Sequence, residues 1–253
     1  MSKKETPAPI KAAPIKTAMV LAAGMGNRMR PLTDSTPKPL IPMLGRPLID
    51  WTFDRLRAGG ITDFVVNSHY LGDQIAAHFK DVPDVTLSPE ADLLETGGGV
   101  KNALPLLGTD PFIVANADMI WLDGPTPAVN RLRNAFDPDR MDVLLLLHPV
   151  AAAWGDYNGA GDYSLDADGR ATRRTEGRVV PLMYAGVSIM KPDVYADAPD
   201  GPFSNLVIFD KAQEEGRLFG LVHDGEWYHI GTPQALSDCA HAIERGWTHA
   251  QTR

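Results

Sequence analysis

Cysteine is almost absent from the chain of 253 residues, which contains only Cys239. An internal disulfide or a metal cluster of several cysteines is therefore excluded. No apolar run approaches the roughly 20 residues that a membrane-spanning helix needs. The first residues, which carry prolines at positions 7, 9 and 14, lack the continuous apolar stretch of a signal peptide. We therefore expect a cytoplasmic protein that does not associate with membranes.

Positive charge is also scarce, since 24 Lys and Arg face 32 Asp and Glu and leave a net charge of −8. This composition lacks the dominant basic field of a nucleic-acid-binding surface, so we expect no nucleic-acid partner. A small phosphate-bearing ligand needs only a few local cations and stays possible. Hydrophobic residues at 44% allow one well-packed core.

Short apolar runs alternate with segments of helical periodicity, which predicts an α/β fold with a mainly parallel, mixed sheet flanked by helices. We expect a flexible tail over residues 1–16 and one domain over residues 17–253. Residues 17–120 and residues 121–253 form the two halves of this domain. Strands are predicted at 18–23, 64–66, 112–115, 143–147, 182–190, 218–222 and 226–230. The Thr126-Pro127 and Thr232-Pro233 pairs are typical of helix N-termini.

A glycine-rich loop follows the first predicted strand, at the edge where α/β sheets bind ligands. Gly24 and Gly26 allow consecutive N–H groups to face an anion, and Arg28 can hold two phosphate oxygens. A dinucleotide-binding loop would need a third glycine where Met29 stands, and the Gly-Lys-Ser/Thr of a P-loop is absent. Taken alone, the loop is equally typical of a tight turn with a surface arginine.

Lys38 lies between Pro37 and Pro39, ten residues after Arg28. Each proline restrains its own backbone and that of the preceding residue, so this lysine is held in position. On its own the segment also fits a proline-rich surface loop.

Together these segments resemble the signature of the sugar-1-phosphate nucleotidylyltransferase family. The shared pattern is Leu-Ala-Ala-Gly-x-Gly-x-Arg, then Pro-Leu-Thr, then Pro-Lys-Pro-Leu, and the resemblance extends from Thr17 to about Ile243. It implies a single Rossmann-like, GT-A-like domain with a nucleotide-binding half over residues 17–120 and a sugar-binding half over residues 121–253. It further implies Mg²⁺ as cofactor and catalytic roles for Arg28, Lys38 and Asp118. It also implies NTP contacts from Leu21, Ala22, Ala23, Gly24, Met25, Gly26, Asn27, Arg28 and Lys38.

A second glycine-rich segment, Glu95-Thr96-Gly97-Gly98-Gly99, follows Ser88-Pro89-Glu90 and precedes a predicted helix. It is similar to the base-recognition loop of the family branch that uridylylates N-acetylmuramate 1-phosphate. This resemblance implies that the uridine base is read by Pro89, Glu90, Thr96, Gly97 and Gly98. Without it, Thr96 is equally typical of a helix cap.

Asp118 follows the predicted strand 112–115, where a carboxylate can bind Mg²⁺. The family pattern places a second metal ligand in Trp-x-Asp-x-Gly-Thr, but His229 occupies the Asp position here. Mg²⁺ prefers oxygen donors to imidazole. Three hypotheses follow: His229 binds the metal, it contacts phosphate or a metal-bound water, or the chain is catalytically impaired. We favour the second, and a packed histidine without a role is the alternative.

The resemblance also implies sugar contacts from Asn116, Gly161 and Asn205, with Arg173 and Arg174 near the acceptor phosphate. A hairpin turn, a helix cap or a solvated charge explains these residues equally well.

We therefore predict a Mg²⁺-dependent enzyme that joins UTP to a sugar 1-phosphate, N-acetylmuramate 1-phosphate being favoured, in cell-wall sugar recycling. The products would be a UDP-sugar and pyrophosphate, and the enzyme would be a monomer or a small homo-oligomer. One alternative is a mannose- or glucose-1-phosphate nucleotidylyltransferase that uses GTP or dTTP. The other is a non-catalytic nucleotide-sugar sensor.

Overall fold

The computed structural model describes residues 15–157 and 159–251. Most of the tail predicted for residues 1–16 therefore lies outside the described residues. Ile15 and Lys16 belong to the fold instead. The Ile15 side chain is fully buried in the core, and the Lys16 carbonyl accepts hydrogen bonds from the N–H groups of Thr62 and Asp63. The folded domain thus begins before Thr17, the predicted boundary.

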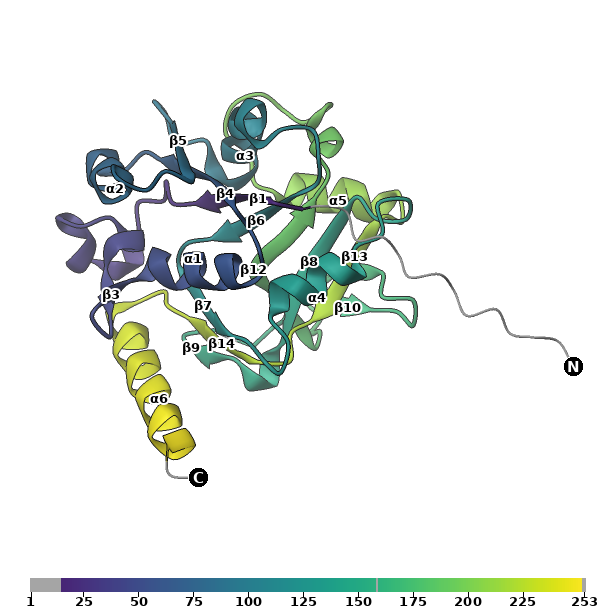
Figure 1. Ribbon diagram of the computed structural model, residues 1–253. Helices are drawn as coiled ribbons and strands as arrows, with labels where there is room; N and C mark the ends of the chain where they lie inside the picture. Colours follow the sequence, from purple (N-terminus) through teal and green to yellow (C-terminus); the bar gives the residue numbers. More distant parts are fainter. Residues whose placement is uncertain (1–14, 158, 252–253) are drawn as a thin grey trace, which may run out of the picture.

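The central element is a nine-stranded mixed sheet (Figure 1). Its main path runs β11-β10-β12-β6-β1-β4-β5, and β8 joins β12 to β13. Strands β6, β1, β4 and β5 are parallel, whereas β12 runs antiparallel to both β6 and β8. The predicted mixed sheet is confirmed. Its strands are β1 (Thr17–Leu21), β4 (Asp63–Ser68), β5 (Val85–Pro89), β6 (Phe112–Asn116), β8 (Val143–Pro149), β10 (Tyr163–Leu165), β11 (Ala171–Arg173), β12 (Leu182–Met190) and β13 (Leu218–Val222).

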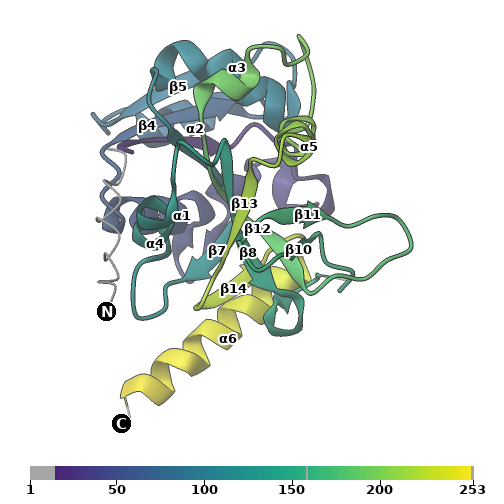
Figure 2. The same cartoon turned by 90° about the vertical axis from the view of Figure 1, so that its right-hand side faces the viewer.

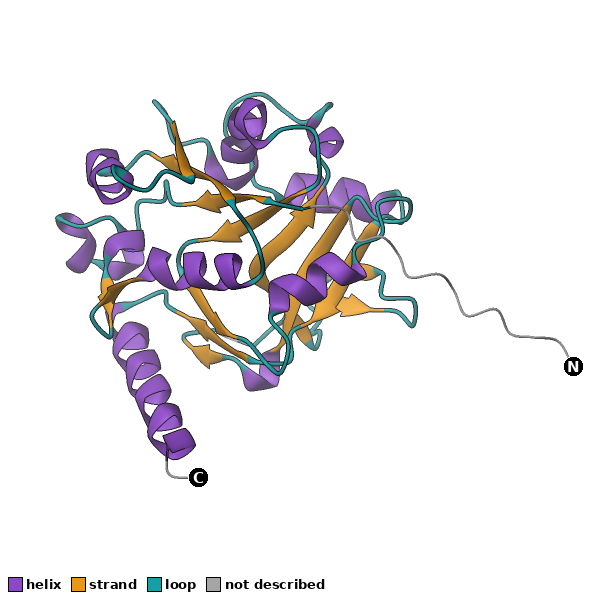
Figure 3. Ribbon diagram, in the orientation of Figure 1, coloured by secondary structure: helices purple, strands orange, loops and turns teal. Residues whose placement is uncertain are grey.

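Two smaller sheets and the helices complete the fold (Figure 3). A three-stranded sheet has the order β7 (Met119–Leu122), β14 (Glu226–His229), β9 (Trp154–Gly155), and β2 (Pro42–Met43) pairs with β3 (Arg46–Pro47). The α-helices are α1 (Leu48–Ala58), α2 (Gly72–Phe79), α3 (Glu95–Leu107), α4 (Ala128–Ala135), α5 (Leu206–Glu214) and α6 (Pro233–Gln251). Short 3₁₀ turns lie at η1 (Asn27–Met29), η2 (Leu32–Asp34), η3 (Lys38–Leu40), η4 (Val150–Ala152) and η5 (Pro192–Tyr195).

Helices cover both faces of the large sheet, with α1 and α4 on one face and α3 and α5 on the other (Figure 2). Strand β1 shows why its sequence is continuously apolar. Ala18 and Val20 pack into the core under α1, whereas Met19 packs under α3. A strand buried on both faces needs apolar residues at every position. In the described part of the chain, no helix combines the length and the apolar character needed to cross a membrane.

Two predicted helix starts differ in outcome. Thr232 is confirmed as a cap, because its hydroxyl accepts a hydrogen bond from the Ala235 N–H at 3.2 Å. Thr126 does not cap α4. Its place is taken by Asp123, whose carboxylate accepts a hydrogen bond from the Ala128 N–H at 2.8 Å. A charged acceptor makes the stronger bond to a helix N-terminus.

Replacement of Ile15 tests whether the fold begins before Thr17. Ile15→Ala removes a fully buried side chain, so the free energy of unfolding should fall by about 2–5 kcal/mol. Val179→Ala is the matched control, because Val179 is 78% exposed and should change stability by less than about 0.5 kcal/mol. Urea unfolding measures both. Equal stabilities of Ile15→Ala and the wild type would show that the fold does not use Ile15.

Candidate active site

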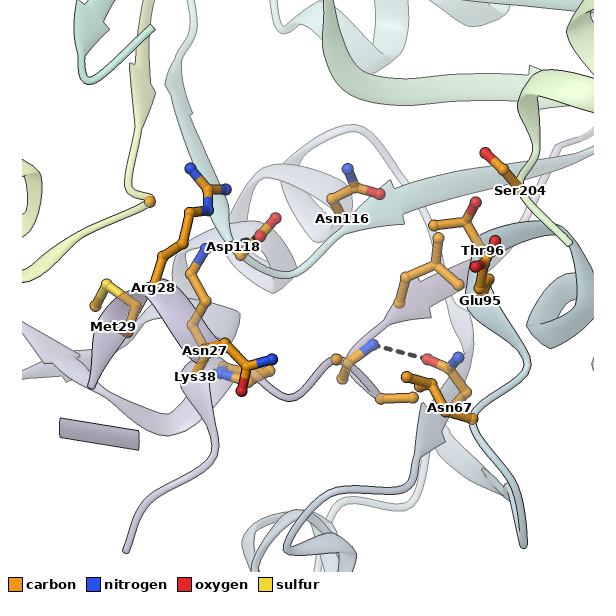
Figure 4. Close-up of a pocket in the computed structure, with 18 residues that line it drawn as sticks. Asn27, Arg28, Met29, Lys38, Asn67, Glu95, Thr96, Asn116, Asp118 and Ser204 are labelled. Atoms are coloured by element: carbon orange, nitrogen blue, oxygen red, sulfur yellow. Dashed lines mark hydrogen bonds and ion pairs between the residues drawn. The ribbon is translucent and has the colours of Figure 1, made fainter. Parts of the chain in front are cut away.

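A cavity of about 490 Å³ opens at the carboxyl ends of the parallel strands β1, β4 and β6. This is the edge where parallel α/β sheets bind their ligands. Arg28 and Asp118 lie on one side of the cavity, with Asn67, Thr96 and Ser204 on the other (Figure 4). Its lining residues are Leu21, Ala22, Ala23, Gly24, Gly26, Asn27, Arg28, Met29, Lys38, Pro39, Asn67, Leu93, Glu95, Thr96, Asn116, Asp118, Ser204 and Gly231.

The glycine-rich loop is held in a tight turn at the cavity. Gly26 adopts the left-handed conformation with φ +62°, and its carbonyl accepts hydrogen bonds from the Met29 N–H and the Thr33 hydroxyl. A Cβ at Gly26 would lie 2.8 Å from Thr33 Cγ2 and 3.0 Å from Lys38 Cβ. Only glycine satisfies both the backbone conformation and the space. Arg28 follows in η1 with a side chain that is 64% exposed, so it is accessible to a ligand.

Lys38 and Asp118 form an ion pair, with 2.7 Å between Nζ and Oδ2. The Lys38 side chain is only 8% exposed, so it is not the surface lysine of a proline-rich loop. Burial by itself would raise the pKa of Asp118, but the Lys38 ammonium and its hydrogen bond outweigh burial and lower that pKa. Asp118 is therefore an ionised oxygen donor at neutral pH.

A buried network on the opposite side, which we did not predict, centres on Asn67. Its Oδ1 accepts a hydrogen bond from the Ala22 N–H, and its Nδ2 donates to Glu90 Oε1, both at 2.7 Å. Glu90 Oε2 in turn accepts from the Leu94 N–H at 3.0 Å. The network ties the start of the glycine-rich loop to the segment before α3.

Gly97 and Gly98 occupy different surroundings from those predicted. They lie inside the first turn of α3 rather than before it, and both donate their N–H groups to the Phe203 carbonyl. A Cβ on Gly97 would lie 2.4 Å from the Phe203 ring. Both N–H groups are therefore already bonded. Of the five predicted base contacts, Thr96 alone is among the residues that line the cavity. Pro89 is exposed and Glu90 is committed to Asn67.

His229 lies against Asp156, with 2.7 Å between Nδ1 and Oδ1, although Nδ1 has no aligned hydrogen-bond partner. Its ring stacks on Trp227 at a centroid distance of 5.8 Å. Burial lowers the pKa of His229 more than the neighbouring carboxylates Asp156 and Asp118 raise it. The imidazole is therefore neutral at neutral pH.

Of the predicted sugar contacts, Asn116 lines the cavity and two others do not. The Gly161 carbonyl accepts a hydrogen bond from Arg174 Nε, and a Cβ there would lie 2.0 Å from the Val180 carbonyl oxygen. Asn205 accepts a hydrogen bond from the Tyr195 hydroxyl and is buried. Arg173 is paired with Asp210. Met25, a predicted nucleotide contact, is 40% exposed and does not line the cavity either.

Several residues that line the cavity were not among the predicted contacts. Asn67 carried a usable signal, because it stands at the carboxyl end of a predicted strand. Glu95 begins the second glycine-rich segment of the sequence analysis, and its left-handed φ of +58° is unusual for a glutamate. Ser204 and Gly231 come from the predicted substrate-binding half, so the cavity draws on both halves of the chain.

The described residues contain no group of three or more His, Cys, Asp or Glu side chains that could hold a metal by themselves. The donors at the Arg28 side nevertheless fit Mg²⁺, because Asp118 is an ionised carboxylate that lines the cavity. Mg²⁺ commonly takes one or two protein carboxylates and completes its shell with substrate phosphates and water.

The family model described as a MobA-like NTP transferase domain matches residues 18–177. The chain belongs to the MobA-like NTP transferase family. It is therefore a nucleotidyltransferase.

Two similar relatives are both called N-acetylmuramate alpha-1-phosphate uridylyltransferase. The protein of Caulobacter vibrioides is 45% identical over 227 residues, which cover 87% of this chain and 93% of the relative. The protein of Neisseria meningitidis is 36% identical over 91% of this chain and 99% of the relative.

Solved structures share the fold at low identity. A UDP-glucose pyrophosphorylase in complex with UDP-glucose has a TM-score of 0.71 at 16% identity, covering 92% of this chain and 99% of that chain. HddC from Yersinia pseudotuberculosis, complexed with GMP-PN, has a TM-score of 0.70 at 21% identity, covering 90% of this chain and all of that chain. The fold expected from the sequence is thus confirmed.

The Lys38–Asp118 pair should make stability depend on pH. The pKa of Asp118 is lowered in the folded protein, so its contribution is present above the unfolded value of about 3.9 and is lost as the pH falls through the folded value. Asp118→Asn should be less stable than the wild type near neutral pH, by about 1–3 kcal/mol, because Lys38 loses its partner.

Urea unfolding at several values between about pH 7 and about pH 3 measures this difference. We expect the two proteins to converge at the acid end. Asp54→Asn removes an exposed partner of Arg46 and is the control, with little effect at any pH. A difference in the free energy of unfolding that stays constant down to about pH 3 would contradict a lowered pKa of Asp118 in the folded protein.

Proposed function

We propose that this nucleotidyltransferase transfers a uridylyl group from UTP to N-acetylmuramate 1-phosphate in a Mg²⁺-dependent reaction. The proposal rests chiefly on the two uridylyltransferase relatives, which match almost the full length of the chain. The products are UDP-N-acetylmuramate and pyrophosphate. The reaction would serve cell-wall sugar recycling in the cytoplasm.

The distribution of charge along the cavity supports this reaction. Arg28 and Lys38 provide cations beside the carboxylate of Asp118 on one side. On the other side, Asn67, Thr96 and Ser204 provide uncharged polar groups (Figure 4). Glu95 provides a carboxylate there, but no cation is present among the described residues that line this side. This arrangement suits a ligand with phosphates at one end and a neutral heterocycle at the other.

The chemistry requires no nucleophile from the protein. A phosphate oxygen of the sugar 1-phosphate attacks the α-phosphorus of UTP, and a new O–P bond forms. The bond between the α-phosphorus and the bridging oxygen breaks, so pyrophosphate leaves with that electron pair. Because negative charge gathers during this step, catalysis depends on positioning and charge stabilisation.

Arg28 and Lys38 carry these roles in our proposal. Lys38 is nearly buried and restrained by flanking prolines, so its ammonium is preorganised to stabilise the α-phosphate in the transition state. Arg28 is exposed at the cavity and can hold the leaving phosphates through its planar guanidinium. Asp118 would hold the divalent cation, which when bound neutralises the developing charge of pyrophosphate.

Pyrophosphate release tests the substrate assignment. We expect the fastest turnover with UTP and N-acetylmuramate 1-phosphate, and none when EDTA replaces Mg²⁺. Pairing GTP or dTTP with mannose or glucose 1-phosphate tests the alternative enzymes. Absence of turnover with every pair would contradict the proposal and favour a nucleotide-sugar sensor.

Replacement of Lys38 tests its catalytic role. Lys38→Met should lower kcat by about 10²–10³-fold, the usual effect of removing one group that stabilises transition-state charge. Lys101→Met is the matched control, since Lys101 pairs with the fully exposed carboxylate of Asp200, and kcat should not change. Thermal unfolding verifies that both variants are folded. A Lys38 variant with wild-type kcat would remove this residue from the reaction.

A further inference from the structure

Asp156 is placed at the active site by strand pairing. Strand β9 runs parallel to β14, with Gly155 opposite His229. Gly155 has φ +99°, and a Cβ there would lie 2.1 Å from the His229 carbonyl oxygen. Only glycine permits this close approach of the two backbones. The pairing therefore brings the next residue, Asp156, beside His229.

The carboxylate of Asp156 contacts two basic groups of the site. Its Oδ1 lies 2.7 Å from His229 Nδ1, and its Oδ2 lies 3.7 Å from Nη1 of Arg28. The backbone of Gly231, which lines the cavity, leaves room for this contact, because a Cβ there would lie 2.6 Å from both Asp156 Oδ2 and Arg28 Nη1. Asp156 is thus at the edge of the cavity, on the side of the expected phosphates.

Asp118 is brought close to His229 by the strand on the other side of β14. Strand β7 pairs with β14 so that Met119 lies opposite His229. Asp118 precedes Met119, and Asp156 follows Gly155. His229 is therefore flanked on its two sides by strands that each carry one aspartate next to the paired residue.

The chemistry of these donors favours the carboxylates over the imidazole. Mg²⁺ takes one or two protein carboxylates together with phosphate oxygens, and it prefers such oxygens to nitrogen. The Asp118 carboxylate already shares its charge with Lys38. A second carboxylate would compensate the dication more fully, and Asp156 is an oxygen donor within contact of Arg28.

We infer that Asp156 is the second carboxylate that holds the divalent cation of this enzyme, together with Asp118. His229 acts as a positioning residue, because its Nδ1 contacts the Asp156 carboxylate and its ring is fixed against Trp227. This inference rests on the proposed function, since the metal is the one that accompanies the nucleotide.

The test compares nucleotide affinity with and without metal. The dissociation constant of α,β-methylene-UTP, which cannot transfer its uridylyl group, is measured by calorimetry in Mn²⁺ and in EDTA. The dissociation constant in EDTA divided by that in Mn²⁺ gives the factor by which the metal increases the affinity for the nucleotide. We expect Asp156→Asn to reduce this ratio about tenfold or more, while the affinity in EDTA stays equal or improves because one anion is removed.

This ratio separates a metal ligand from a residue that only positions Arg28. A positioning role would weaken binding equally in Mn²⁺ and in EDTA, so an Asp156→Asn ratio equal to that of the wild type would overturn the inference. Retained affinity in EDTA also shows that the variant is folded. Asp197→Asn, which removes an 83% exposed partner of Lys211, is the control and should leave the ratio unchanged.

A double variant tests whether the carboxylate can come from the adjacent strand. Combining His229→Asp with Asp156→Asn moves the carboxylate from the segment after β9 to the adjacent strand β14. We expect the ratio of dissociation constants to recover most of the way to the wild-type value. A wild-type protein that does not bind the nucleotide under either condition would contradict the proposed function itself. The two failures are therefore distinguishable.

Discussion

The ion pair between Lys38 and Asp118 connects the two segments that form the side of the cavity where we propose that the phosphates bind. Lys38 stands in η3, between two prolines, and Asp118 stands between β6 and β7. A lysine that is only 8% exposed needs a partner for its charge. The pair therefore holds the proline-rich segment against the sheet, and this segment can pack against the turn at Gly26 because that residue has no Cβ.

The opposite side of the cavity is held by buried hydrogen bonds. Asn67 links the backbone of Ala22 to Glu90, and a Cβ on Gly99 would lie 2.7 Å from the Glu90 carboxylate. The glycines at the start of α3 thus allow the helix to approach the Asn67–Glu90 pair and the Phe203 backbone. The cations Arg28 and Lys38 lie on one side only, whereas the other side has amide and hydroxyl groups and the Glu95 carboxylate, so the two sides of the cavity differ in charge (Figure 4).

Elements with strong local signals were predicted well from the sequence. The bounds of β12 and β13 agree with the prediction, because both are apolar runs ended by polar residues or proline. Strands β7 and β9 were missed. They are short and are stabilised by pairing with β14, a long-range contact that leaves no local pattern.

The contrast between local signals and long-range contacts also explains which residues of the site could be predicted. The loop from Leu21 to Arg28 could be predicted from its glycines, and the position of Lys38 from its flanking prolines, because these are local features of the sequence. Most of these residues line the cavity as expected. Gly97 and Gly98 were predicted to read the base because their segment resembles one of the family. Their packing against Phe203 has no local signal, because the two segments lie far apart in the sequence. Asp156 was overlooked for the same reason, since only the β9–β14 pairing brings it to His229.

The dispersal of the cavity wall along the chain has a thermodynamic consequence. Its residues run from Leu21 to Gly231. A complete binding surface therefore exists only when β14 of the three-stranded sheet, which precedes Gly231, has taken its place. Ligand binding is therefore linked to cooperative folding of nearly the whole chain rather than of its first half. At a concentration about 1,000 times Kd, a bound nucleotide would add about 4 kcal/mol to that global stability, so the nucleotide supply of the cell would itself protect the enzyme against unfolding.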